Sequence, residues 1–551
     1  MPESRRCPCF ALVLVAITAV TPATAREHAD LAIVDGRVHD GGTGPSRGGD
    51  VIIRDGRIVA VGPGAAGGYD AARVVDARGR VVAPGFIDPH THPGTYIHAQ
   101  DAAARRVLPW LFQGVTTLGI GVDGGGPPHV ARQRAWFQAQ GVGVNLVPFV
   151  GLGPVRREVL GEAARAPDAD ELARMESLVA QAMCEGAFGF STGLFYAPQS
   201  FAGTGEVVAL ARQAARRGGL YDTHQRDESS YGIGLLASTA EAIDIGRQAG
   251  IPVHFAHLKA LGADVHGQAP ALVEMIEAAR AEGLRVTADQ YPWLASGTGL
   301  SAAVLPRWAQ DGGRPMLLQR LADPAQAARI AGEMEANLRR RGGPAAILFT
   351  SPGAPWRGRT LAQLADDWQI GAVEAALRVI RGDGLPQSRP RESIASFNMD
   401  EDDVRLLMRQ PWMVTSSDGT DGHPRQYASF PEKYARYVRE QGVLDLDTFI
   451  HRSTGLTADI LGLPDRGRLR PGMHADVVVF DPQAYAPGAD YLAPDVLAHG
   501  VELLLVNGVP AIDGGRATDA LAGRMLAKGA PAGTCPAGDT PPPLSHEVIG
   551  R

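Results

Sequence analysis

The chain has 551 residues, of which 45% are hydrophobic and 21% charged, and its formal net charge at pH 7 is −7. This is the composition of a globular protein, so fibrous and wholly disordered classes are excluded. The acidic balance also argues against nucleic acid as a partner, because binding to phosphates needs a basic surface.

Residues 1–25 have the pattern of a secretory signal peptide. A basic start (Arg5, Arg6) precedes an apolar run from residue 10 to 20, and Ala23-Thr24-Ala25 offers a small-x-small cleavage site. The alternative is an uncleaved anchor helix, for which the apolar run is short. We therefore expect cleavage after Ala25, a secreted or periplasmic protein, and no membrane contact after cleavage.

Cys184 and Cys535 are the cysteines that remain after this cleavage. A chain of this length can build its core without disulfides even when it is exported, so we expect none. The end of the chain, residues 528–551, contains a run of three prolines and is expected to be disordered.

Two regions, residues 26–83 and 461–527, contain short alternating strands separated by glycine turns, as in DVIIRDGRIVAVG and VELLLVNGVPAIDGG. Neither region has enough strands to be stable alone. We therefore expect the two ends of the chain to pair into one small β-sandwich domain.

Residues 84–460 instead alternate strands with helices. Helical periodicity is clear in DADELARMESLVAQAMCEG, and the candidate strands number eight: they end at FIDPHTH, GVTTLGIGVD, VGVNLVPFVG, AFGFSTGL, GLYDTHQ, IPVHFAHLK, LRVTADQYP and PWMVTSSDG. Eight such units predict an α/β fold, a (β/α)₈ TIM barrel. Residues from about 296 to 351 are long for one connection, and we expect them to form a lid over the active-site face.

Polar side chains follow several of these strands, where barrel enzymes place their sites. His90 and His92 are two residues apart, so both can point to one side of an extended segment, and His224, His257 and Asp418 end later strands. A lone His-x-His pair is weak evidence, and scattered core or surface histidines are the alternative. The shared position at strand ends favours a site for one or two Zn²⁺ ions.

Several motifs carry a family resemblance over residues 30–525. VAPGFIDPHTH with the later single histidines resembles the amidohydrolase superfamily. The combination with GAFGFSTGLFYAP, YDTHQRDES, HFAHLKALG, VTADQYPW, SSDGTDGHPR and LRPGMHADVVVFDP resembles the N-acyl-D-amino-acid deacylase (D-aminoacylase) family.

The resemblance implies metal-dependent hydrolysis of N-acyl-D-amino acids to a carboxylate and a D-amino acid. It implies that His90 and His92 hold one metal, that His224 and His257 hold the other, and that Asp418 is the catalytic acid and base. It further implies that the α-carboxylate of a small-molecule substrate is bound by Lys259, Tyr291 and Arg425.

The residues give these substrate assignments some independent support. The lysines of the chain are Lys259, Lys433 and Lys528, so a lysine two residues after His257 suggests that a compact ammonium group is needed there. The alternatives are a surface lysine for Lys259 and a packed aromatic ring for Tyr291. His254 falls off the face of His257, and we interpret it as structural.

One position departs from the family. The family commonly has a cysteine after the second strand, where this chain reads Gly121-Val122-Asp123-Gly124. A carboxylate can bridge two ions, so Asp123 is expected to be a metal ligand; a turn aspartate is the alternative. Glu158 is the reserve candidate. A carboxylated lysine, the bridge in other amidohydrolases, is excluded because no lysine precedes Lys259.

Three rival functions follow from the same residues. A cyclic-amide hydrolase would use the lysine bridge that this chain lacks. A dipeptidase acting on peptides with a C-terminal D-residue would use the same carboxylate-binding groups. A metal-free scaffold on this fold would be expected to have lost ligands, whereas all four of the histidines and Asp418 are present.

Overall fold

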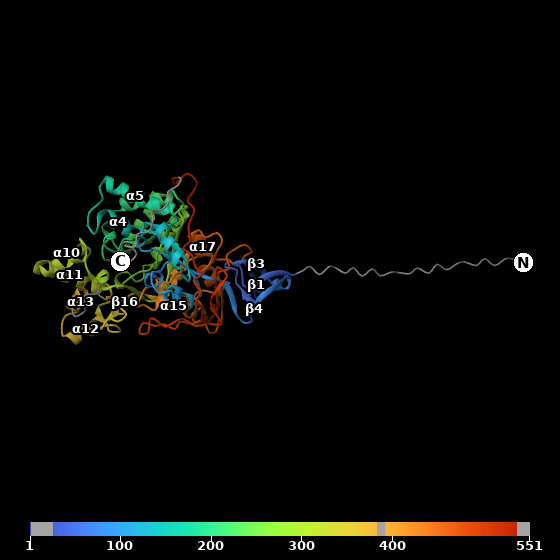
Figure 1. Ribbon diagram of the computed structural model, residues 1–551. Coiled ribbons are helices and arrows are strands. Elements are labelled where there is room, and N and C mark those ends of the chain that lie inside the picture. The colour runs from blue at the N-terminus through green and yellow to red at the C-terminus, as the bar shows by residue number, and fades with distance from the viewer. Residues whose placement is uncertain (2–25, 383–391, 537–551) are drawn as a thin grey trace.

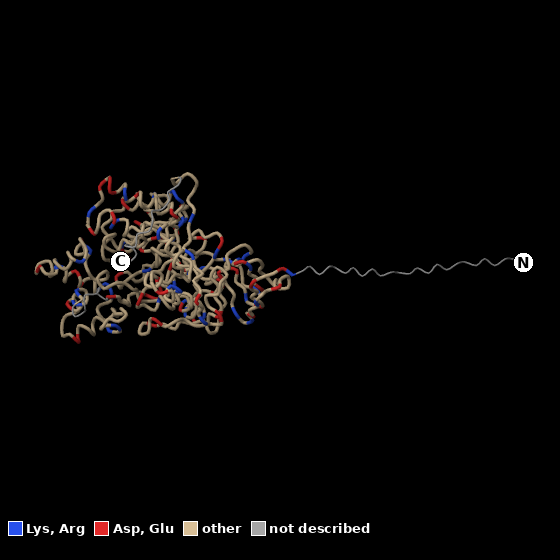
Figure 2. Tube along the Cα trace, viewed as in Figure 1, with Lys and Arg blue, Asp and Glu red and all other residues tan. Residues whose placement is uncertain are grey.

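The computed structural model describes Met1, residues 26–382 and residues 392–536. The expected signal peptide therefore lies outside the described residues, apart from Met1. In the described part of the chain, no helix combines the length and the apolarity that crossing a membrane would require. Acidic and basic residues are interspersed along the whole fold (Figure 2).

Strands from both ends of the chain form one nine-stranded sheet, as expected for the small β domain. Its order is β21-β20-β19-β18-β5-β1-β2-β3, with β4 also paired to β1. The antiparallel pairing of β5 with β18 joins the two ends. The bounds are β1 Glu27–Val38, β2 Arg47–Arg54, β3 Arg57–Gly62, β4 Tyr69–Asp76, β5 Val81–Pro84, β18 Val477–Phe480, β19 Val501–Val506, β20 Val509–Asp513 and β21 Arg516–Ala517.

Alternate residues of these strands point into a common core, as the period of a β-strand requires. Leu31 and Ile33 of β1 pack in one cluster with Val477 and Val479 of β18. The early and late segments therefore bury each other's apolar faces, and neither half of the domain is complete alone.

The middle of the chain forms the predicted (β/α)₈ barrel. Its strands pair in parallel as β17-β13-β12-β11-β10-β9 and as β6-β7-β8, where β8 and β9 are parts of one segment interrupted at Phe149. The bounds are β6 Phe86–Asp88, β7 Val115–Ile120, β8 Asn145–Pro148, β9 Val150–Gly151, β10 Gly189–Gly193, β11 Leu220–His224, β12 Val253–Phe255, β13 Val286–Gln290 and β17 Met413–Thr415.

Backbone hydrogen bonds join the two sets of strands. The amide of Phe188 donates to the carbonyl oxygen of Pro148 at 2.8 Å, and on the other side the amide of Asp418 donates to that of His90 at 3.0 Å. The second contact brings the ends of the first and last strands together, and with them two of the candidate site residues.

Helices cover the barrel strands, and α5 shows why the sequence forms them. Asp168 and Glu171 make a capping box, in which each side chain accepts a hydrogen bond from the other residue's amide. Met175, Val179 and Ala182 form its buried face, at helical spacing. The covering helices are α3 Val130–Gln140, α4 Leu152–Leu160, α5 Ala169–Cys184, α6 Thr204–Ala215, α7 Leu235–Ala249, α8 Ala269–Ala281, α14 Glu401–Met408, α15 Arg425–Glu432, α16 Leu446–Ser453 and α17 Gly455–Leu461.

The insertion between β13 and β17 is larger than the expected residues 296–351. It has its own three-stranded sheet, β14-β16-β15, and its own hydrophobic cluster. It projects from the barrel on the side opposite to β1, β3 and β4 (Figure 1). Its elements are β14 Ala295–Gly299, α9 Leu300–Val304, α10 Gly313–Ala322, α11 Pro324–Arg340, β15 Ile347–Phe349, α12 Leu361–Trp368, α13 Ala372–Arg381 and β16 Ser393–Phe397.

The expectation of no disulfide is wrong, because Cys184 and Cys535 are bonded, with their Cα atoms 5.7 Å apart. After the β domain the chain runs back along the barrel, where the amide of Leu526 donates to the carbonyl of Leu146 and that of Lys528 to Gly186. This return brings Cys535 to the end of α5. The expected disorder therefore does not hold for residues 528–536, while residues 537–551 lie outside the described part.

We expect Cys535→Ser to lower the free energy of unfolding by about 2–4 kcal/mol, because the bond closes a long loop and so restricts the unfolded chain. Denaturant unfolding of the oxidised protein measures this change. Cys184→Ser is the matched control and should have the same effect, with no further loss in the double variant. Equal stability of wild type and variants would contradict this role.

Candidate metal centre and active site

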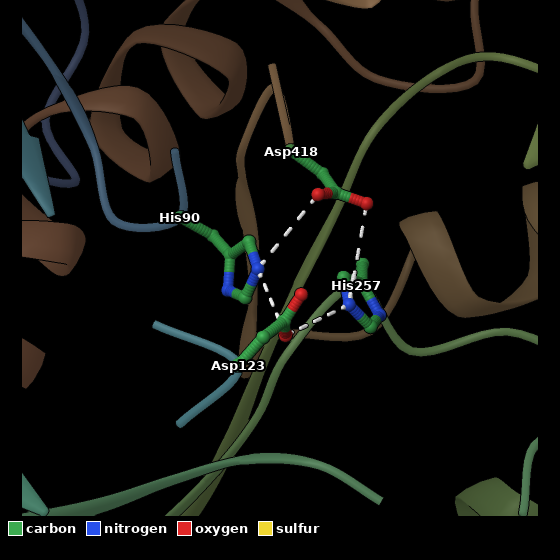
Figure 3. A group of neighbouring side chains, drawn as sticks. All are labelled: His90, Asp123, His257 and Asp418. Atoms are coloured by element: carbon green, nitrogen blue, oxygen red, sulfur yellow. Dashed lines mark ion pairs between the residues drawn. The ribbon is translucent and has the colours of Figure 1, made fainter. Parts of the chain in front are cut away.

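The predicted site residues meet at the carboxyl ends of the barrel strands. Each of them ends a strand or closely follows one: His90 and His92 follow β6, Asp123 follows β7, His224 ends β11, His257 follows β12 and Asp418 follows β17. Figure 3 shows His90, Asp123, His257 and Asp418 pointing toward one another from different strands. The structure thus brings together residues that are up to 328 positions apart, because parallel strands end at the same rim of the barrel.

The carboxylate of Asp123 lies at the middle of the histidines. Its Oδ1 is 3.2 Å from His90 Nε2, 3.3 Å from His257 Nε2 and 3.6 Å from His224 Nδ1. Its Oδ2 is 3.2 Å from His92 Nε2. One carboxylate therefore contacts all four histidines, which is the geometry that a bridging ligand needs.

Asp418 closes the group from the other side. Its Oδ1 lies 3.2 Å from His92 Nε2 and 3.8 Å from His90 Nε2, and its Oδ2 lies 4.0 Å from His257 Nε2. Arg425 holds it there through a contact of 2.6 Å between Nη1 and Oδ2. Although burial would raise the pKa of Asp418, the charge of Arg425 beside it holds that pKa well below its usual range.

The donor set fits a divalent metal ion. His224 Nδ1 and His257 Nε2 are 3.0 Å apart, and among the described residues the buried atoms His90 Nε2, His224 Nε2 and Asp123 Oδ1 have no hydrogen-bond partner. Buried polar atoms are normally satisfied, so a cation among them resolves the arrangement. Imidazole nitrogens with carboxylate oxygens are the ligands of zinc.

The pKa values of two of the histidines also indicate a site for a cation. Burial disfavours protonated histidine, yet hydrogen bonds to Asp123 and Asp418 raise the pKa of His92 to about 9. Burial and the charge of Lys259 likewise oppose protonation of His257, but nearby carboxylates raise its pKa to about 10. The carboxylates therefore stabilise positive charge at this site, which protons or a metal ion can supply.

Three of these residues have backbone conformations that are unusual for non-glycine residues. The φ angles of Asp123, His257 and Asp418 are 52°, 34° and 47°. Positive φ costs free energy in a residue with a Cβ atom, and it is retained where the surrounding structure requires it. Here it turns each side chain inward at the point where its strand ends.

Glu228 is a site residue that sequence reasoning missed. Its Oε1 lies 3.2 Å from His257 Nδ1, on the side of the ring that faces away from Asp123, and accepts a hydrogen bond of 2.7 Å from Lys259 Nζ. Its Oε2 is 3.7 Å from His224 Nε2. The signal was present in YDTHQRDES, a carboxylate four residues after a strand-end histidine. Such outer carboxylates orient the histidine ligands of a metal.

The residues expected to bind a substrate carboxylate also lie together. Lys259 is only 4% exposed, so it is no surface lysine. Its Nζ lies 5.6 Å from the ring centre of Tyr291, and Arg425 Cζ lies 5.3 Å from the same ring. All three line one small pocket with Asp418 and His257.

Two residues lie outside the centre. His254 contacts Asp289 at 3.1 Å and Thr287 at 2.8 Å, and it is not among the residues around Asp123. The reserve candidate Glu158 pairs with His129 at 3.4 Å in a half-exposed position and does not approach the strand-end histidines.

A cavity of about 270 Å³ opens beside the centre. The barrel contributes His92, Asp123 and Asp418 to its wall, and the insertion contributes Thr298, Thr350 and Ile394. The insertion therefore forms part of the wall of the active-site cavity.

A histidine and carboxylate cluster with a cavity at this end of a (β/α)₈ barrel defines the class of metal-dependent hydrolases. Comparison with known proteins narrows the class. The model of the amidohydrolase family matches residues 155–512. The chain is 34% identical to N-acyl-D-aspartate deacylase of Alcaligenes xylosoxydans xylosoxydans, with 92% of this chain and 96% of that protein covered.

Two further comparisons also match this chain with N-acyl-D-amino-acid deacylases. D-aminoacylase of the same organism is 33% identical, with 91% of this chain and 98% of that protein covered. A solved structure of N-acyl-D-glutamate deacylase from Bordetella bronchiseptica, complexed with zinc and a phosphonate mimic of the tetrahedral intermediate, has a TM-score of 0.76 at 30% identity and covers 91% of this chain and 100% of that one. The chain belongs to the amidohydrolase family, and its relatives there include N-acyl-D-amino-acid deacylases.

The pKa values of His92 and His257 predict proton release when zinc binds to protein stripped of metal by a chelator. With these pKa values both rings carry a proton at pH 7 and must lose it to act as ligands, and the pKa of His90 is raised as well. At least two protons should therefore leave, and zinc affinity should rise steadily from pH 7 to pH 9. Calorimetry in two buffers of different ionisation enthalpy measures the number. Binding without proton release would contradict these protonation states.

Proposed function

We propose that this protein hydrolyses the amide bond of N-acyl-D-amino acids in a metal-dependent reaction, giving a carboxylate and a D-amino acid. The observation that carries the proposal is the joining of two groups in one pocket: the histidine and aspartate centre, and the cationic and hydroxyl groups of Lys259, Tyr291 and Arg425. The substrates named for the relatives support the same reaction.

The metal ligands in this proposal are His90, His92, Asp123, His224 and His257, holding one or two zinc ions. When bound, the metal supplies Lewis acidity, which polarises a carbonyl and makes water a nucleophile near neutral pH. The carboxylate of Asp123 stands where the family commonly has cysteine, and its contacts with the four histidines support a bridging role.

Asp418 moves the proton. Its suppressed pKa keeps it ionised at neutral pH, so it can accept a proton from the attacking water. The same carboxylic acid then donates that proton to the leaving nitrogen, which must depart as a neutral amine. Its position between His92 and Arg425 places it at the border of the metal centre and the substrate pocket.

Lys259, Tyr291 and Arg425 bind the α-carboxylate of the substrate. An ammonium, a phenol and a guanidinium are hydrogen-bond donors, and the two charged donors give the stronger bonds to a carboxylate. Burial of all three in one pocket strengthens these interactions, since water competes less there.

We also infer that the chain is exported. The signal-peptide pattern of residues 1–25 supports this inference, and so does the Cys184–Cys535 bond, because disulfides persist in oxidising compartments.

A screen of the zinc-loaded protein tests the proposed reaction. N-acetyl-D-amino acids should be hydrolysed, N-acetyl-L-amino acids and cyclic amides should not, and dipeptides with a C-terminal D-residue form a separate arm. Asp418→Asn should retain its zinc but lower kcat by about 10²- to 10⁴-fold, because it removes proton transfer. Normal turnover in this variant would refute the mechanism. Hydrolysis of L-substrates alone would refute the substrate class.

Asp123→Asn tests the bridging role. The amide is neutral and a poor bridge, so we expect zinc affinity to fall by about tenfold or more, with a parallel loss of kcat. Asp123→Cys should keep partial activity. Asp55→Asn is the matched control, because Asp55 has the same φ of 52° in a solvent-exposed turn. Full zinc content and normal rate in Asp123→Asn would show that Asp123 is only a turn residue.

A further inference from the structure

The substrate pocket contains a buried cation that the proposed reaction does not use. Arg341, which directly follows α11 of the insertion, is 2% exposed and lines the same small pocket as Lys259, Tyr291 and Arg425. Its guanidinium donates to hydroxyl groups only: Nε to Tyr231 at 2.6 Å and Nη1 to Ser296 at 3.3 Å. No carboxylate of the described residues lies within ion-pair distance of it.

The charges of this pocket do not balance without an additional anion. Lys259 is paired with Glu228 at 2.7 Å, and Arg425 with Asp418 at 2.6 Å. These pairs are internally neutral, so the charge of Arg341 is left over. A buried cation without a counter-ion costs folding free energy, and such a cost is typical of a site that binds a charged partner.

Neighbouring residues add to this positive charge. Arg307 Cζ lies 3.8 Å from the ring centre of Phe195, another residue that lines the pocket, and Arg340 Cζ lies 5.8 Å from the ring centre of Tyr231. Neither guanidinium has a carboxylate partner in the described part of the chain. Burial lowers the pKa of Arg307 to about 10, which leaves it charged at neutral pH.

We propose that Arg341 forms an anion subsite for the side-chain carboxylate of the substrate, so that the preferred substrates are N-acyl derivatives of dicarboxylic D-amino acids. This inference rests on the proposed function, because it assumes that Lys259, Tyr291 and Arg425 take the α-carboxylate. A planar guanidinium presents paired donors that match a carboxylate, and its charge is permanent.

The position of Arg341 assigns the anion to the amino-acid part of the substrate and not to the acyl group. The small pocket holds Arg341 together with Lys259 and Tyr291. The larger cavity shares Asp418 and Arg425 with the small pocket, but it is lined further on by Thr350 and Ile394 and does not include Arg341. An acyl group extending into that cavity would not approach Arg341.

The test compares matched acid and amide substrates: N-acetyl-D-glutamate with N-acetyl-D-glutamine, and N-acetyl-D-aspartate with N-acetyl-D-asparagine. For at least one pair, wild type should favour the acid in kcat/KM by about ten- to a hundredfold, the worth of one charge-assisted hydrogen bond. Arg341→Met should remove this preference by lowering kcat/KM for the acid, while kcat/KM for the amide stays within about threefold.

Matched variants distinguish a direct contact between Arg341 and the substrate from the combined electrostatic field of the neighbouring arginines. Arg340→Met removes a neighbouring charge that does not line the pocket and should keep most of the acid preference, and Arg341→Lys should keep part of it. If Arg341→Met does not fold, Tyr231→Phe is tested in its place. This variant removes the hydroxyl group that accepts a hydrogen bond from Arg341 Nε and so holds the guanidinium in position, and it should raise KM for the acid alone.

Several outcomes would overturn the subsite. These are a wild-type enzyme without acid preference, an equal loss on acid and amide in Arg341→Met, or an equal loss of preference in Arg340→Met. If wild type hydrolyses none of the N-acetyl-D-amino acids, the proposed function has failed. The subsite is then judged by calorimetric binding of D-glutamate against D-glutamine, where equal affinity would reject it.

Discussion

The packing of several histidines around the carboxylate of Asp123 is the arrangement on which the rest of the site depends. Asp123 lies between 3.2 and 3.6 Å from ring nitrogens of four histidines that come from three different strands. Nitrogen lone pairs and carboxylate oxygens repel one another unless positive charge lies between them. The carboxylates raise the pKa values of His92 and His257 because protonated rings supply positive charge between these groups. A divalent ion supplies the same positive charge while the ligands stay unprotonated.

The barrel satisfies this constraint through its backbone. Parallel strands end at one rim, so single residues from distant segments reach the same point. Positive φ angles at Asp123, His257 and Asp418 then direct the side chains inward. Beneath them Asp289 accepts a hydrogen bond of 2.9 Å from the amide of His257, and Glu228 contacts its ring at Nδ1. The histidine is therefore held from its backbone and from its side chain.

Two ion pairs connect the metal centre with the substrate pocket. Lys259 shares Glu228 with His257, and Arg425 shares Asp418 with His92. Each cation that is proposed to bind the substrate is thus already neutralised by a carboxylate next to a proposed metal ligand. Arg341 differs from both because its contacts are with hydroxyl groups, which leaves its charge available. The cations of the pocket therefore differ in the charge that they can offer to an anion.

The barrel, the β domain built from both ends of the chain and most residues of the candidate metal centre could be predicted from the amino-acid sequence. These features depend on local rules: strands alternate with helices at regular spacing, His90 and His92 share a side because they are two residues apart, and strand ends face one rim. Glu228 was also within reach, as a carboxylate near His224 in the same segment, but sequence spacing alone does not show that it meets His257 and Lys259.

The disulfide, the extent of the insertion and the position of Arg341 could not be predicted, because each depends on contacts between segments that are far apart in the sequence. The Cys184–Cys535 bond spans a separation of 351 residues and exists because the chain returns along the barrel after the β domain. The insertion extends to Phe397 because a strand beyond residue 351, β16, completes its sheet. Arg341 is one arginine among many in the sequence, and only the packing of α11 beside the barrel rim places it in the substrate pocket.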